Sequence, residues 1–141
     1  DAPPLPMGRG EVRRQGRDIA VLSFGALLAP ALDAAESVNA TVANMRFVKP
    51  LDEALVLELA RTHHHLVTLE DNVVAGGAGS AVAECLARHG VTTTLTHLGL
   101  PDRFLEHGSR EELLAACGLD ASGIETSLRT LLPAPRVRQR H

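Results

Sequence analysis

The most constraining feature of this sequence is the stretch from Leu66 to Ser80, where an apolar run meets polar residues and a glycine-rich turn. Residues 66–69 have the apolar character and the length of a short strand. The polar residues follow directly: Glu70, Asp71 and Asn72. The turn contains Gly76, Gly77 and Gly79, and a helical pattern begins at Ser80. In an open parallel sheet, ligands and partner surfaces gather at the carboxyl ends of the strands. We therefore predict the functional surface at the end of this strand.

Other apolar runs alternate with helical patterns along the chain. Strands are predicted over residues 10–14, 19–25, 40–47, 66–69 and 91–98. Helices are predicted over residues 27–38, 52–61 and 80–88, and after the N-cap residues Ser109 and Asp120. Such alternation implies βαβ units with right-handed crossovers. The predicted fold is α/β: a doubly wound, mostly parallel sheet of about five strands, with one antiparallel edge strand at residues 10–14 and helices on both faces.

The chain has the length of one domain, since it contains 141 residues. We assign this domain to residues 10–132. Residues 1–9 are rich in proline and begin without an initiator Met, so we interpret them as a linker from missing upstream domains. Residues 133–141 carry three arginines after two prolines and are predicted to form a disordered basic tail.

Composition argues against two classes of partner. A net charge of −3 gives no electrostatic attraction to nucleic acid, and three phenylalanines without Trp or Tyr leave little for bases to stack on. No apolar run reaches the length of a membrane span, and the first residues lack a signal-peptide pattern. Cys85 and Cys117 fall in predicted helices and are interpreted as small buried hydrophobic residues of a reducing compartment. We therefore expect a cytoplasmic protein without nucleic-acid or membrane partners.

The glycine-rich turn allows two interpretations. It matches neither the dinucleotide fingerprint nor a P-loop, which requires Lys after glycine. Its backbone N–H groups could hold a phosphate at the start of the following helix. Alternatively, the missing side chains let the helix approach the sheet or a neighbouring subunit closely. We favour close packing.

Charged residues near the strand ends also allow more than one role. Carboxylates such as Glu70 and Asp71 can bind metal or act as acid and base. Consecutive strand residues point to opposite faces, however, so these two are not expected to converge on one ion. Hydrogen bonding at an interface or helix capping is the favoured role. Arg46, at the end of the strand over 40–47, either binds an anion or pairs with Glu70.

The histidines give no clear site. His63, His64 and His65 are consecutive and therefore spread around the backbone, whereas zinc sites have wider ligand spacings. Their ordinary explanation is a favourable interaction with a helix C-terminus. His97 and His107 have no neighbouring nucleophile and are interpreted as structural or interfacial. No catalytic, cofactor-binding or metal-binding residue is predicted in this chain.

Several segments together resemble a known family. They are NMRFVKPLDE at residues 44–53, the stretch over 66–84, GLPDRF at 99–104 and CGLDASGI at 117–124. These segments closely resemble the C-terminal domain of 1-deoxy-D-xylulose-5-phosphate synthases, which are thiamine-diphosphate enzymes of the transketolase group. The resemblance extends from about residue 5 to about residue 132, nearly the whole chain.

The resemblance implies a role that the residues alone do not. Enzymes of this family condense pyruvate with glyceraldehyde 3-phosphate, release carbon dioxide, and feed isoprenoid, thiamine and pyridoxal biosynthesis. They are homodimers whose other two domains bind thiamine diphosphate and Mg²⁺. A chain holding only the third domain is expected to be inactive and to serve dimer and interdomain assembly. The residues expected to contact the missing domains or the second copy are Arg46, Glu70, Asp71, Asn72, Gly76, Gly77 and Gly79.

Two alternatives remain at this point. Pyruvate dehydrogenase β subunits and transketolases share the expected fold, although the phrases MRFVKPLDE and GLPDRF argue against them. A stand-alone module that binds a phosphorylated metabolite is the other alternative, supported by the glycine-rich turn before Ser80.

Overall fold

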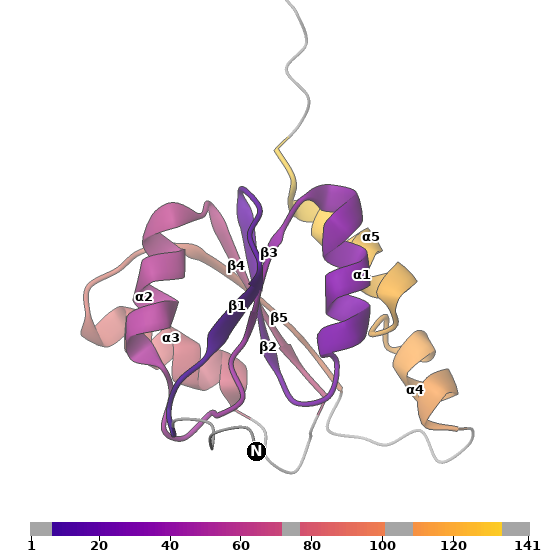
Figure 1. Cartoon of the computed structure of the whole chain (residues 1–141), viewed down its shortest axis with the longest axis horizontal. Helices are drawn as coiled ribbons and strands as arrows, with labels where there is room; N and C mark the ends of the chain where they lie inside the picture. Colours follow the sequence, from indigo (N-terminus) through magenta and orange to yellow (C-terminus); the bar gives the residue numbers. More distant parts are fainter. Residues whose placement is uncertain (1–6, 72–76, 101–108, 134–141) are drawn as a thin grey trace, which may run out of the picture.

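The computed structural model describes residues 7–71, 77–100 and 109–133 (Figure 1). Its strands are β1 (Glu11–Arg14), β2 (Ile19–Phe24), β3 (Thr41–Asn44), β4 (His65–Glu70) and β5 (Thr94–Gly99). Its helices are α1 (Leu28–Val38), α2 (Glu53–Thr62), α3 (Ala78–Arg88), α4 (Arg110–Ala116) and α5 (Ala121–Leu131). The five described strands form one sheet in the order β1-β3-β2-β4-β5. β1 pairs with β3 antiparallel and every other pair is parallel, so the predicted fold class is confirmed.

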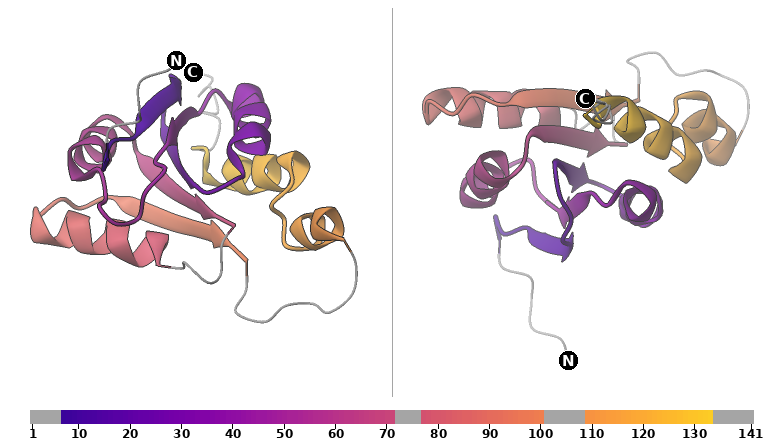
Figure 2. Two further views of the ribbon diagram at one scale, coloured as in Figure 1. Left: turned by 60° about the horizontal axis from the view of Figure 1, so that its bottom comes forward. Right: turned by 90° about the horizontal axis from the view of Figure 1, so that it is seen from above.

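Helices cover both faces of the sheet, which gives three layers (Figures 1 and 2). All six residues of β2, the central strand, are buried. Its side chains alternate between two cores: Leu22 and Phe24 lie with α2 and α3, whereas Ile19 and Val21 lie with α1 and α5. Burial on both faces explains why this strand is a continuous apolar run and not an alternating one.

Short-range signals place the helix starts correctly. Asp52 accepts a hydrogen bond from the backbone N–H of Leu55 at 3.1 Å and caps α2. The other two caps behave in the same way: Ser109 accepts from the N–H of Glu112 at 3.1 Å, and Asp120 accepts from the N–H of Gly123 at 2.8 Å. Each side chain satisfies one of the N–H groups that a helix leaves without a backbone partner.

Three element boundaries differ from the prediction. β3 ends at Asn44 and not at residue 47, because the backbone of Arg46 turns to a φ of 62°. β5 begins at Thr94 and not at residue 91, since the N–H of Val91 bonds instead to the carbonyl of Leu86 in α3 at 2.9 Å. α3 begins at Ala78, ahead of Ser80, because Gly77 at a φ of 107° is already its N-cap.

The two ends of the chain fall largely outside the described residues. Residues 1–6 of the predicted linker and residues 134–141 of the predicted tail are among those not described, so the assigned domain boundaries stay predictions. Among the described helices, none combines the length and the apolar character that a membrane crossing requires.

Candidate functional site

The residues predicted to form the site lie at the carboxyl end of the parallel strands, but they do not form one cluster. Glu70 is the last residue of β4, Asp71 follows it, and both are buried. Gly77 and Gly79 lie at the start of α3, while Arg46 follows β3. The predicted residues Asn72 and Gly76 lie outside the described residues.

Asp71 links three elements of the domain. Its Oδ1 accepts a hydrogen bond from the backbone N–H of Ala26 in the turn between β2 and α1, at 3.3 Å. Its Oδ2 accepts from Nη2 of Arg110, the first residue of α4, at 2.5 Å. Gly25, with a φ of 102°, makes room for the carboxylate, because a Cβ at residue 25 would overlap Asp71 Oδ1. Asp71 therefore stabilises the fold where β4 ends.

Arg46 has a partner that the sequence analysis did not name. Its Nη2 lies 3.1 Å from Oε2 of Glu11 on the edge strand β1. The positive φ of Arg46 turns the chain out of β3, next to that edge. The structure therefore pairs Arg46 with Glu11 and not with Glu70. The anion-binding alternative for Arg46 stays a prediction.

The two described glycines of the turn have different roles. A Cβ at Gly79 would lie 2.9 Å from Nδ1 of His97, so glycine lets α3 approach β5 closely at this point. That nitrogen is itself 2.6 Å from Oγ1 of Thr68 on β4. At Gly77, no atom of the described residues lies within 4 Å of a built Cβ, and the requirement there is the positive φ. Close packing, the favoured interpretation, is thus found at Gly79.

A shallow pocket of ≈ 320 Å³ opens at the start of α3. It is lined by Gly77, Gly79, Ser80, Ala83 and His97. The groups available there are the backbone N–H donors of a helix start and one imidazole, whose Nδ1 is engaged by Thr68. Taken over the described residues, the pocket lining contains no carboxylate and no cysteine, so it supplies no acid–base pair with a nucleophile.

The three consecutive histidines point in different directions, as predicted. His63 is buried, with Nε2 2.7 Å from Thr41 Oγ1 and Nδ1 3.0 Å from the carbonyl of Leu59. His64 is exposed. His65 contacts Thr96 Oγ1 through Nε2 at 2.7 Å, and burial lowers the pKa of its imidazole. His63 and His65 therefore tie α2 and β4 to their neighbours; His107 lies outside the described residues.

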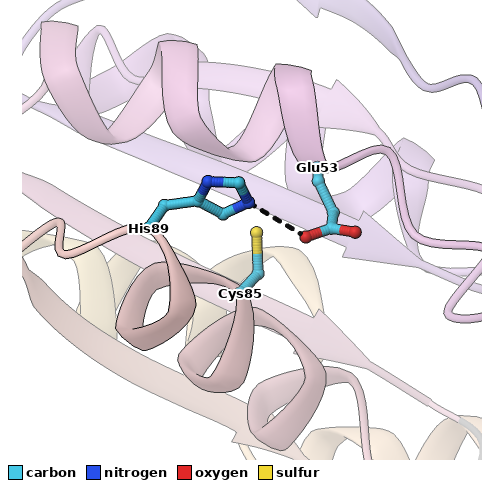
Figure 3. A group of neighbouring side chains, drawn as sticks. All are labelled: Glu53, Cys85 and His89. Carbon is cyan, nitrogen blue, oxygen red and sulfur yellow. Dashed lines mark hydrogen bonds and ion pairs between the residues drawn. The ribbon is translucent and has the colours of Figure 1, made fainter.

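A group that the sequence analysis missed lies between α2 and α3 (Figure 3). Glu53, Cys85 and His89 each place one potential ligand atom within 4.8 Å of the other two. Burial, with a smaller contribution from Glu53, raises the pKa of the Cys85 thiol to about 11. The interpretation of Cys85 as a buried small residue is confirmed but incomplete. The signal available in the sequence was the spacing of Cys85 and His89, four residues apart on one helix.

The decisive comparison concerns the family. A profile described as the transketolase C-terminal domain matches residues 8–124, which is most of the chain. The chain belongs to the transketolase C-terminal domain family. In this transketolase C-terminal domain, the site described above lies at the carboxyl edge of the sheet, at the ends of β3 and β4 and the start of α3.

Curated relatives of this transketolase C-terminal domain carry one name. A 1-deoxy-D-xylulose-5-phosphate synthase of Thioalkalivibrio sulfidiphilus is 67% identical over 128 residues, which cover 91% of this chain. The enzyme of the same name from Nitrosococcus oceani is 65% identical over 126 residues, or 89% of this chain. The matched region is only 20% of each relative's length. The resemblance noted in the sequence is thus confirmed.

A solved structure supports the same fold. It is titled a split gene transketolase, inactive β4 tetramer, and it matches with a TM-score of 0.81 at 34% sequence identity. The match covers 94% of this chain and 45% of that chain.

The described residues do not fit the thiamine diphosphate and Mg²⁺ that the family resemblance implies for the parent enzyme. Mg²⁺ prefers an octahedral set of oxygen ligands. The oxygens of Asp71 are engaged by Ala26 and Arg110, and the group of three potential ligands contains a thiol, a softer donor. No chemical step through either group is derived for this chain.

Proposed function

We propose that this chain is the C-terminal domain of a 1-deoxy-D-xylulose-5-phosphate synthase and that it serves dimer and interdomain assembly. The observation that carries the proposal is the 67% identity, over 91% of the chain, to a relative with that name. The parent enzyme would condense pyruvate with glyceraldehyde 3-phosphate and release carbon dioxide, using thiamine diphosphate and Mg²⁺ bound by its other domains. Its product would supply isoprenoid, thiamine and pyridoxal biosynthesis.

The surface around the start of α3 supports an assembly role. Gly77, Ser80 and Ala83 are exposed there, and all three are small. Small exposed residues on a helix let a neighbouring backbone approach closely. Asp71, by contrast, is engaged inside the domain. We therefore propose that the start of α3, more than the buried carboxylates, contacts the upstream domains or the second copy.

The isolated chain is expected to assemble without activity. The structural relative is titled an inactive β4 tetramer, so a protein that contains this fold forms an oligomer that has no activity. We propose the same relation here, with a cytoplasmic location, which agrees with the two free cysteines Cys85 and Cys117.

The sharpest test changes one exposed residue in the full-length synthase. Ala83→Arg adds a long charged side chain at the pocket rim, where it should not disturb the core of the domain itself. We expect a smaller dimer fraction in sedimentation experiments and a parallel loss of synthase activity. Ala87→Arg, at an exposed position one turn further along α3, is the matched control and should leave both unchanged. Substituting Gly77 is less informative, because its positive φ strains any other residue with or without a partner.

Two outcomes separate the parts of the proposal. If the Ala83→Arg enzyme stays fully dimeric and active, the assembly surface is placed wrongly. If the full-length parent shows no synthase activity with pyruvate, glyceraldehyde 3-phosphate, thiamine diphosphate and Mg²⁺, the assignment to this enzyme is wrong. Calorimetry with inorganic phosphate tests the stand-alone alternative, since saturable binding lost in Ala83→Arg would favour a phosphometabolite module.

A further inference from the structure

Three side chains of different chemistry converge between the first turn of α2 and the end of α3, outside the site described above (Figure 3). Glu53 is the first residue of α2, Cys85 lies in α3, and His89 is the C-cap of α3. One carboxylate oxygen, one sulfur and one imidazole nitrogen lie within 4.8 Å of one another. The assembly is not a simple ion pair, because it combines two helices and three kinds of donor.

The fold itself fixes two of the three donors. Residues four apart on a helix share one face, so Cys85 and His89 point the same way. Cys85 is fully buried, whereas His89 and Glu53 are partly exposed, which leaves one side of the group open to water. Glu53 comes from another helix, so an ion held by all three would cross-link α2 and α3.

We propose that Glu53, Cys85 and His89 bind a zinc ion, with water completing a four-coordinate site. Zinc takes cysteine sulfur, histidine nitrogen and carboxylate oxygen together, whereas Mg²⁺ and Ca²⁺ take oxygen ligands. Ligand bonds of about 2.0–2.3 Å around a tetrahedral zinc ion bring the donor atoms to about 3.5 Å from one another. The observed separations, at most 4.8 Å, need only small side-chain adjustments to reach that geometry.

Metal binding has one competitor and one proton to release. Arg88 Nη2 donates to Glu53 Oε1 at 2.5 Å, and His89 Nε2 lies 3.3 Å from the same oxygen. The side chains of Arg88 and Glu53 are about half exposed, and exposed pairs of this kind are weak enough to yield to a metal ion. The Cys85 thiol transfers its proton to solvent as the Zn–S bond forms, because thiolate is the ligand.

Cobalt titration of the 141-residue chain tests the site. The metal-free chain is titrated with Co²⁺, whose bond to a thiolate produces charge-transfer absorption, and the Co²⁺ is then displaced with Zn²⁺. We expect one equivalent of Co²⁺, a thiolate band, and a rise of the thermal midpoint with Zn²⁺ because the ion binds the folded state. His89→Ala changes an exposed helix end and should retain the fold while weakening binding by at least about 100-fold, beyond the loss typical of outer-shell changes.

Matched variants locate the ion. Cys117→Ser removes the other thiol, and His64→Ala removes an exposed histidine elsewhere, so both should keep the band. Cys85→Ser and Glu53→Gln should lose it or bind more weakly. Arg88→Ala should bind more tightly, since the competing guanidinium is gone. The proposal is overturned if the unmodified chain gives no thiolate band, if His89→Ala retains full affinity, or if Cys117→Ser abolishes the band.

Discussion

The ion pair between Asp71 and Arg110 gives the most direct test of how this domain is held together. α4 has no buried residue of its own, so few of its contacts depend on burial of apolar side chains. Arg110, its first residue, bonds to a carboxylate whose side chain is only 6% exposed. Arg110→Ala should therefore loosen α4 and leave a buried carboxylate that has lost its charged partner.

The magnitude follows from the unequal exposure of the two partners. Arg110 is 59% exposed, which places the pair well below the cost of breaking a fully buried one. Asp71 is nearly buried, which places the pair above an exposed pair. A hydrogen bond to a charged group contributes about 1.5–3 kcal/mol, and we expect about 1.5 kcal/mol here. With a urea slope of about 1.5 kcal/mol/M, the unfolding midpoint should fall by about 1 M.

Urea unfolding of the 141-residue chain measures this, with Arg129→Ala as the matched control. Arg129 on α5 is 53% exposed, close to Arg110, but its partner Glu125 is 34% exposed. The two arginines thus differ mainly in the burial of the carboxylate they bind. Arg110→Ala should lower the midpoint clearly more than Arg129→Ala. Equal shifts would refute the reasoning, because burial of Asp71 would then add nothing to the pair.

Further predictions concern a glycine and a histidine. Gly25→Ala should destabilise the domain by more than the roughly 1–2 kcal/mol typical of a left-handed backbone conformation, because the new Cβ meets the Asp71 carboxylate. Gly77→Ala, at a similar φ but with no described atom within 4 Å, should lose only the backbone contribution, and equal losses in urea unfolding would contradict the clash. Burial lowers the pKa of His65, so the unfolded chain takes up its proton first as pH falls below about 6.5, and stability should decline there. His65→Gln should flatten this part of the urea-midpoint profile, and His64→Gln, at an exposed position, should not.

Local chemistry explains how much of the fold could be predicted. The strand over residues 19–24 is apolar throughout because both its faces are buried, and that pattern survives in the sequence without any partner. The caps at Asp52, Ser109 and Asp120 act over three residues, so their signals are contained in the local sequence. The ends of β3 and β5 were misplaced because long-range contacts decide them. Met45 donates its N–H to the carbonyl of Ser23, and no local pattern reports that bond.

The candidate site was harder to predict for the same reason. Asp71 and Arg110 are 39 residues apart, and the partner of Arg46 lies on the antiparallel edge strand, 35 residues away. Strand order and register decide both pairs, and neither can be read from composition or spacing. Glu53 reaches Cys85 and His89 only because α2 and α3 lie against the same face of the sheet. Only the spacing of Cys85 and His89 was visible beforehand.

The internal pairing of Asp71 and Arg46 changes the kind of interface to expect in the parent enzyme. Charged residues free at the strand ends would orient a neighbour by electrostatics, and such an interface weakens as salt rises. Asp71 bonds to Arg110 and Arg46 bonds to Glu11, so both charges are already compensated within the domain. The small exposed residues at the start of α3, Gly77, Ser80 and Ala83, offer shape and not charge. Assembly through this surface should therefore depend on close fit, be sensitive to added volume at Ala83, and respond little to ionic strength.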